Sequence, residues 1–287
     1  MKNVKPAVVI SSYRRSYKFF VRLRWPKKRY CPRCISKVLW KLKEKRYKCK
    51  RCRYKFGDFT GTYLGKLKIP INEIAHILYL FTLGVPAYRI KEYAEVSLKT
   101  IQKVFTTIRE AIYNQTIFEL KEADISGEIE MDETMFGGKH SGKRGWGASG
   151  KNMIFGIYQR NGKVFTFPIS SRSKEALLAI IYKHTKPGSL YYTDDWHAYS
   201  SLSIRGNHVI ITKEKGKPKG RNHLNGIEGF WSFAKNWLYQ YRGVPQHHFH
   251  LYLKEIEFRF NHRSENLFIL FAKLITNLVP NVTQLPT

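Results

Sequence analysis

Residues 223–235 read HLNGIEGFWSFAK, and the rest of the chain is interpreted outward from this stretch. Its large apolar side chains recur at helical spacing, which predicts an amphipathic helix with one buried face made of Ile227, Phe230, Trp231 and Ala234. Glu228 stands beside that face, and Lys235 follows it by two helical turns, so both point roughly the same way. A lone carboxylate beside an apolar stripe is more often a surface charge than a site residue. Its role therefore depends on whether upstream strands bring other carboxylates to the same place.

Positive charge is concentrated at the N-terminal end of the chain. The 287 residues carry a formal net charge of +30, and residues 1–56 hold 21 Lys or Arg against a single acid, Glu44. A positive field of this density attracts polyanions, of which nucleic acid is the commonest. A basic solubility tail or a contact with acidic lipid are the alternatives. Aromatic side chains alternate with the cations here, which favours an ordered binding surface over a loose tail.

The sequence carries no export or membrane signal. No signal peptide opens the chain, and the longest apolar run, residues 267–279, is interrupted by Lys273 and is too short to span a bilayer. We therefore expect a cytoplasmic, nucleoid-associated protein, or a nuclear one if the host is eukaryotic. In that compartment the cysteines are expected to be reduced.

All four cysteines lie in one cluster, as two CxxC pairs separated by fourteen residues: Cys31, Cys34, Cys49 and Cys52. Two such pairs can present four thiolates to Zn²⁺ in a tetrahedron. The residues between them are typical of a β-hairpin, which predicts a zinc ribbon in a domain with a basic arm over residues 1–58. Because this domain has little core, the metal should supply much of its folding energy. Two redox CxxC motifs are the alternative, but no thioredoxin-like β-α-β pattern surrounds them.

Residues 66–115 predict a helix-turn-helix domain. Apolar periodicity indicates a helix over residues 71–83, a short helix over 86–93, and a third helix capped by Ser97. Three-helix bundles without a DNA partner share this pattern, but the basic zinc ribbon beside it favours DNA. Four polar side chains near the start of the third helix are then the expected DNA contacts: Lys99, Thr100, Gln102 and Lys103.

Residues 125–275 change to strands interleaved with helices. Strands are expected over residues 127–134, 153–158, 163–169, 189–193 and 208–212. Helices are expected over residues 173–184, 196–202, 223–235 and 248–261. This order predicts an α/β domain with a mixed sheet flanked by helices. A basic, glycine-rich loop over residues 137–151 adds two candidate DNA contacts, Lys143 and Arg144.

Asp132 and Asp194 each fall where a predicted strand ends, and Glu228 lies on the helix after the last strand. Three carboxylates at one edge of a sheet repel one another unless cations lie among them, and they suit two Mg²⁺ or Mn²⁺ ions. Such ions activate a water or a 3′-hydroxyl for attack on a phosphodiester. The neighbouring acids Glu133 and Asp195 are expected to be solvated, although Asp195 remains an alternative to Asp194.

Four motifs together resemble the DDE transposases of bacterial and archaeal insertion sequences, in the zinc-ribbon group related to the eukaryotic Merlin elements. They are MDET with GGK (131–139), YTDDWHAY (192–199), HLNGIEGFWSFAK (223–235) and YLKEIEFRFNHR (252–263). The resemblance implies a ribonuclease-H-like catalytic domain, two-metal cleavage and strand transfer, and a homo-oligomer when transposon ends are paired. It also implies that Asp132, Asp194 and Glu228 are the catalytic acids and that Lys235 contacts phosphate. Some members use a different third residue, so Asn225 remains an alternative.

Two other functions fit the same motifs. One is a DNA-binding regulator with a silent catalytic domain, and the other is a structure-specific nuclease without strand transfer. A regulator has no need of three acids and Lys235, which argues against it. Inverted repeats beside the gene would separate transposition from simple hydrolysis.

Overall fold

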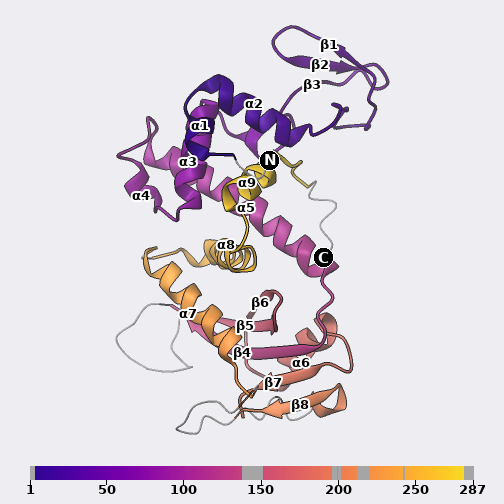
Figure 1. Ribbon diagram of the computed structural model, residues 1–287, viewed down its shortest axis with the longest axis vertical. Coiled ribbons are helices and arrows are strands. Elements are labelled where there is room, and N and C mark those ends of the chain that lie inside the picture. The colour runs from indigo at the N-terminus through magenta and orange to yellow at the C-terminus, as the bar shows by residue number, and fades with distance from the viewer. Residues whose placement is uncertain are drawn as a thin grey trace. The chain divides into compact units, whose positions relative to one another are not determined.

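The computed structural model describes residues 4–137, 151–195, 199, 202–211, 220, 222–241 and 243–280 (Figure 1). The chain forms two compact units, one comprising Met1–Gln115 with Arg263–Thr287 and the other Thr116–His262. The second unit overlaps the expected catalytic range 125–275 without coinciding with it, because residues 263–275 belong to the first unit. Within the described segments, no helix is long and apolar enough to cross a membrane.

The first unit contains the predicted zinc ribbon. Strands β1 (Leu39–Lys41), β2 (Arg46–Cys49) and β3 (Lys55–Gly57) form an antiparallel sheet in that order. Its core is small and is made of Trp25, Cys31, Cys49 and Phe56. A core of this size agrees with the expectation that the domain depends on a metal.

The basic arm before the ribbon is helical, which the composition did not predict. Helix α1 spans Pro6–Ile10 and α2 spans Tyr13–Arg24. Helix α2 packs against α3 (Ile71–Thr82) and α9 (Leu267–Thr276), and the rings of Phe19 and Phe268 stack at 5.6 Å. The apolar side of α2 is thus covered by residues from the far end of the sequence, while four of its five cations stay exposed and Arg24 is buried.

Three helices occupy the range of the expected helix-turn-helix. After α3 come the short α4 (Ala87–Ile90) and the long α5 (Leu98–Glu122), whose residues contribute to both units. The Thr100 backbone N–H donates to Ser97 Oγ at 3.3 Å, so the expected cap of the third helix is present. A 3-10 turn, Leu64–Lys66, precedes these helices.

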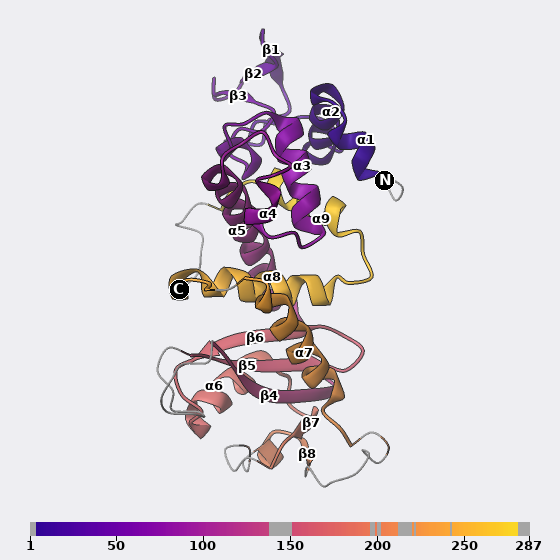
Figure 2. The ribbon, with the colours of Figure 1, turned by 90° about the vertical axis from the view of Figure 1, so that its left-hand side faces the viewer.

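The second unit is a mixed sheet flanked by helices, as predicted. Its strands are β4 (Glu128–Phe136), β5 (Asn152–Gln159), β6 (Val164–Ile169), β7 (Leu190–Thr193) and β8 (Asn207–Ile210). Figure 2 shows them side by side in the order β6-β5-β4-β7-β8. Strands β4, β5 and β6 are antiparallel, whereas β7 runs parallel to both β4 and β8. Strand β4 therefore lies at the centre.

Each face of this sheet has its own core because strand side chains alternate between faces. Ile129 and Met131 of β4 belong to the cluster that includes α6 (Lys174–His184). Phe136 of β4 belongs to the cluster that includes α7 (Asn225–Tyr239) and α8 (Phe249–Asn261). Even-numbered residues of β4 thus face α7, and odd-numbered residues face α6. The remaining described helices are short 3-10 turns at Leu202–Ile204 and Gln246–His248.

Candidate active site and metal centre

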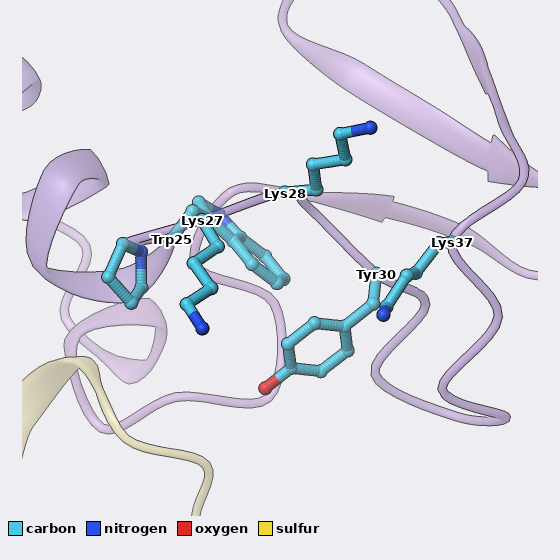
Figure 3. A pocket seen from close by; sticks show the side chains of 6 residues that line it. Trp25, Lys27, Lys28, Tyr30 and Lys37 are labelled. Carbon is cyan, nitrogen blue, oxygen red and sulfur yellow. The ribbon is translucent and has the colours of Figure 1, made fainter.

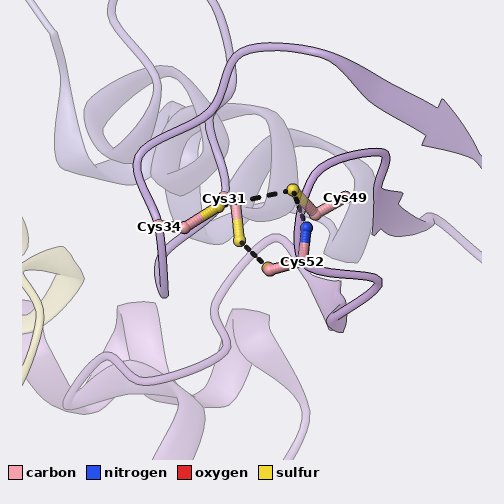
Figure 4. Close-up of side chains that lie close together, drawn as sticks. All are labelled: Cys31, Cys34, Cys49 and Cys52. Atoms are coloured by element: carbon pink, nitrogen blue, oxygen red, sulfur yellow. Dashed lines mark hydrogen bonds between the residues drawn. The ribbon is translucent and has the colours of Figure 1, made fainter.

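The four cysteine thiols of the ribbon converge on one point (Figure 4). Their sulfur atoms all lie within 4.8 Å of one another, and the Cys31–Cys52 and Cys34–Cys49 sulfurs are each 3.5 Å apart. The Cys52 backbone N–H donates to Cys49 Sγ and lowers the pKa of that thiol to about 6. Four convergent sulfurs, one of them already favoured as thiolate, are a donor set that fits a structural zinc ion.

Replacing Cys49 by Ser should remove the metal and unfold the ribbon. A structural zinc supplies about 10–16 kcal/mol of apparent binding energy to domains of this kind, and three thiolates hold it far less tightly than four. Metal analysis should find one zinc per wild-type chain and almost none in the variant. Ser36→Ala, beside the same cluster but without a thiol, should keep its zinc. A metal-free wild-type protein after gentle purification would refute the zinc ribbon.

Asp132 lies on the face of β4 that packs against α7. Its Oδ2 accepts a hydrogen bond of 3.1 Å from the indole Nε1–H of Trp231, which is buried on α7. The carboxylate itself is half-buried. Trp231 therefore both anchors α7 on the sheet and fixes one oxygen of Asp132.

The register of β4 and β7 relates the positions of Asp132 and Asp194. In the parallel ladder between β4 and β7, Glu130 pairs with Tyr192. Two residues beyond that pair on each strand come Asp132 and Asp194, at the point where β7 ends. Neighbouring strands lie about 4.8 Å apart, so this register predicts that Asp194 lies close to Asp132. Asp195 is the next residue and is exposed, as expected for a solvated neighbour.

Helix α7 is bonded to β4 on both sides of Glu228. One residue before Glu228, the Ile227 backbone N–H donates to Glu130 Oε2 at 2.9 Å. One turn after it, Trp231 donates to Asp132. A carboxylate that accepts from the first turn of a helix caps it and stabilises its dipole. Glu228 is exposed at the margin of the buried face, in line with Leu224 and Trp231.

Lys235 and Asn225 also lie on the exposed part of α7. Asn225 is its first residue, and Lys235 lies two turns beyond Glu228. The helix phase places Lys235 on roughly the same side as Glu228, as expected from its spacing of two turns.

The three acids are not drawn together into one ligand cluster. Among the residues that the structure describes, only the four cysteines lie close enough to hold a metal ion as they stand. The expectation that Asp132 lies where a strand ends is wrong, because β4 continues to Phe136 and Asp132 is in its middle. Asp194 directly follows β7, as expected, and Glu228 is on the helix that covers the Asp132 face of the sheet. Carboxylate oxygens are the donors that Mg²⁺ and Mn²⁺ prefer, so the chemistry of the set fits these cations.

Glu133 is buried, so the expectation that it is solvated is wrong. It accepts hydrogen bonds from the Tyr199 hydroxyl at 2.5 Å and from Arg172 Nη2 at 3.1 Å. Burial raises the pKa of Glu133, and these two partners oppose that rise. The sequence did contain a signal for this position, since Glu133 shares the alternation of Ile129 and Met131.

Glu133 and Tyr199 join β4 to the segment that follows Asp194. Tyr199 is fully buried, and its burial raises the pKa of its hydroxyl well above the ordinary value. The charges of Glu133, Asp194 and Asp132 act in the same direction, which places Tyr199 within electrostatic reach of both aspartates. The hydrogen bond from Tyr199 to Glu133 therefore connects two chain segments close to the candidate site.

Two glycines let α7 approach the sheet. A Cβ on Gly156, which pairs with Asp132 across β4 and β5, would lie 2.5 Å from Trp231 Cζ2. A Cβ on Gly226 would lie 2.1 Å from Tyr158 Cε1. Real side chains do not pack so closely, so a larger residue at either position must push α7 away from β4.

Gly156→Ala should therefore displace α7 and weaken the bond between Trp231 and Asp132. We expect a loss of about 1–3 kcal/mol in unfolding free energy, measured in urea, because the sheet backbone gives little. The matched control is Gly229→Ala in the same helix, where an added Cβ meets nothing within 4 Å. That change should stabilise the protein by up to about 1 kcal/mol through helix propensity. Equal urea midpoints for Gly156→Ala and the wild type would contradict the packing argument.

The expected DNA contacts of the third helix lie on the first turns of α5. Lys99, Gln102 and Lys103 are exposed there. Thr100 is half-buried, and its hydroxyl lies 3.0 Å from Ser97 Oγ, so it takes part in the helix cap. Lys143 and Arg144 lie outside the described residues.

Two families match the chain. The ISXO2-like transposase domain matches residues 124–261, and the transposase zinc-ribbon domain matches residues 14–55. An uncharacterized transposase-like protein of Haemophilus influenzae is 39% identical over 100 residues, which cover 34% of this chain and 81% of that protein. An uncharacterized protein in transposable element ISH50 of Halobacterium salinarum is 22% identical over 278 residues, covering 88% of this chain and 92% of that protein.

Among solved structures, the crystal structure of the Mos1 strand transfer complex aligns with 69% of this chain and 78% of its own chain. The TM-score is 0.24 and the sequence identity is 10%. A likeness of that size carries no weight for the fold, which rests on the sheet described above.

Proposed function

The chain belongs to the IS1595 family of DDE transposases, and we propose that it cuts DNA at transposon ends and joins them to target DNA by two-metal catalysis. The observation that carries this proposal is the β4–β7 register, in which Asp132 within β4 and Asp194 just after β7 occupy equivalent positions, under a helix that is bonded to β4 on both sides of Glu228. The order of the five strands, antiparallel on one side of β4 and parallel on the other, supports a ribonuclease-H-like domain.

Asp132, Asp194 and Glu228 would hold the two divalent ions, which supply an activated water or 3′-hydroxyl and stabilise the leaving oxygen. Trp231 keeps one oxygen of Asp132 in place, and Glu130 keeps the start of α7 against the same strand. Lys235 offers a cation on the exposed side of α7, suited to a phosphate of the bound strand. Asn225 is retained only as an alternative third ligand.

DNA binding falls to the first unit. Its N-terminal 56 residues carry 21 cations, and α5 exposes Lys99, Gln102 and Lys103 on its first turns. The zinc ribbon and the three helices α3 to α5 would contact the transposon end as a ribbon and a helix-turn-helix, and Lys143 and Arg144 would add contacts beside the catalytic domain. Two ends must be held together for paired cleavage, so the active form would be at least a dimer, associated with the nucleoid.

The test is incubation of the purified protein with labelled DNA from the sequences flanking its gene, together with Mg²⁺ or Mn²⁺. We expect nicks at defined positions and, in addition, joined products with a second DNA. Nicks without joined products would identify a nuclease, and binding without nicks would identify a regulator. Either result would overturn the proposal of strand transfer.

A further inference from the structure

A cavity of about 480 Å³ lies where α2 leads into the zinc ribbon (Figure 3). Its walls come from one short stretch and one lysine further on: Trp25, Pro26, Lys27, Lys28, Tyr30 and Lys37. Cavities that bind small organic groups measure roughly 300–1,000 Å³. This cavity is therefore large enough for a chemical group of that class.

The walls combine flat rings with amines. The rings of Trp25 and Tyr30 meet edge to face, with centroids 5.0 Å apart at 84°. Trp25 is buried in the ribbon core, whereas Tyr30 is half-buried and offers part of its ring to the cavity. Lys27, Lys28 and Lys37 are exposed and line the same cavity (Figure 3). The lysine stems continue the apolar surface, and their amines stand at its edge.

No carboxylate neutralises these amines within the part of the chain that the structure describes. The carboxylate of Asp58 has other partners, because it accepts hydrogen bonds from Arg29 Nε at 2.7 Å and from the Tyr17 hydroxyl at 2.6 Å. Like charges gathered without an acid repel one another, and a bound anion would relieve that repulsion.

Behind Trp25 lies the buried guanidinium of Arg24. The guanidinium of Arg24 stacks 4.4 Å from the centre of the Trp25 ring, and only 8% of Arg24 is exposed. Its Nε and Nη2, and the indole Nε1 of Trp25, are buried and form no hydrogen bond with any described group. Burial lowers the pKa of Arg24, and its interaction with Tyr30 opposes that shift only in part, which fits a cation in an apolar setting without a carboxylate. The indole is thus backed by a charge that adds to the positive potential of the cavity.

We propose that this cavity binds one unpaired nucleotide of DNA, with its base against Tyr30 and its phosphate among Lys27, Lys28 and Lys37. The inference rests on the proposed function, since it supposes that DNA is the ligand. Aromatic rings beside cations hold single-stranded DNA because every base has a flat face that can stack. A paired base is covered by its neighbours in the duplex, so only an unpaired or flipped base can enter such a cavity.

The experiment compares two DNA probes on the full-length, zinc-loaded protein. One is a plain duplex, and the other is the same duplex with a short unpaired strand that carries a single 2-aminopurine. The wild type should bind the second probe more tightly and should quench its fluorescence by stacking. Tyr30→Leu keeps an apolar side chain but loses the ring, so the preference for the unpaired probe should fall about tenfold and the quenching should disappear.

Charge is tested with two matched triple variants. The cavity variant replaces Lys27, Lys28 and Lys37 by Gln. The control variant replaces Lys41, Lys43 and Lys50 by Gln, and these three lysines lie in the ribbon but outside the cavity. Both lose three charges, so binding to the plain duplex should weaken to a similar extent. Only the cavity variant should lose the preference for the unpaired strand.

The possible outcomes separate this inference from the function on which it rests. If the wild type binds neither probe, the proposed DNA-binding function fails and this inference fails with it. If it binds the duplex but Tyr30→Leu and the cavity variant keep the full preference and the quenching, the nucleotide site alone is refuted. Zinc content near one per chain shows that a variant is still folded.

Discussion

Asp132→Asn and Asp194→Asn are each expected to lower DNA cleavage by about a thousandfold or more, while end binding stays within a fewfold of the wild type. Asn has the size of Asp and can still accept the hydrogen bond from Trp231 Nε1, so the fold should survive. It lacks the charge that holds a divalent cation, and loss of one group that stabilises a transition state already costs about 10²–10³ in rate. Single-turnover nicking with Mg²⁺ measures the first effect, and gel-shift titration measures the second.

Asp195→Asn provides the matched control for this pair. It makes the same chemical change one residue away, at an exposed position beyond the end of β7. We expect it to cleave at close to the wild-type rate. The reverse result, with Asp195→Asn inactive and Asp194→Asn active, would move the second aspartate by one residue. Full activity of Asp132→Asn would remove Asp132 from the site.

The strands were predictable from the sequence because apolar alternation is a local signal. The pattern around residues 189–193 correctly placed Asp194 directly after a strand. The pattern around residues 127–134 found β4 but not its end, because β4 continues to Phe136 and Asp132 lies in its middle. The same alternation also marks Glu133 as facing the other core. The prediction that Glu133 is solvated was based on its charge and not on its position in the strand, which is why it was wrong.

Other features depend on contacts between distant parts of the chain. Nothing local to Gly156 indicates that the Trp231 ring lies against it, and nothing local to Glu130 indicates that it caps α7. Likewise, α2 forms where composition suggested only a basic arm, because residues after position 263 cover its apolar side. Such features depend on contacts between elements that are far apart in the sequence. No local sequence pattern indicates these contacts.

Two residues of α7, Glu228 and Asn225, are candidates for the third metal ligand. A substitution at each of them distinguishes the two. Glu228→Gln should lower cleavage by about 10²–10³-fold, since it removes a charge from a helix held against β4 on both sides of that residue. Asn225→Ala should change cleavage by no more than a fewfold. Asn225 is the first residue of α7, whereas the bonds from Ile227 and Trp231 bracket Glu228.

Metal dependence distinguishes a lost ligand from a disturbed helix. If Glu228 binds the cations, Glu228→Gln should need a higher Mn²⁺ concentration for half-maximal nicking, and its urea midpoint should not change. Glu175→Gln is the control, because it makes the same change at an exposed position on α6, which packs on the opposite face of the sheet. A rise in the Mn²⁺ requirement for Asn225→Ala but not for Glu228→Gln would assign the third ligand to Asn225. A change in neither variant would place the third ligand off this helix, because Glu228 and Asn225 are the two candidates that α7 offers.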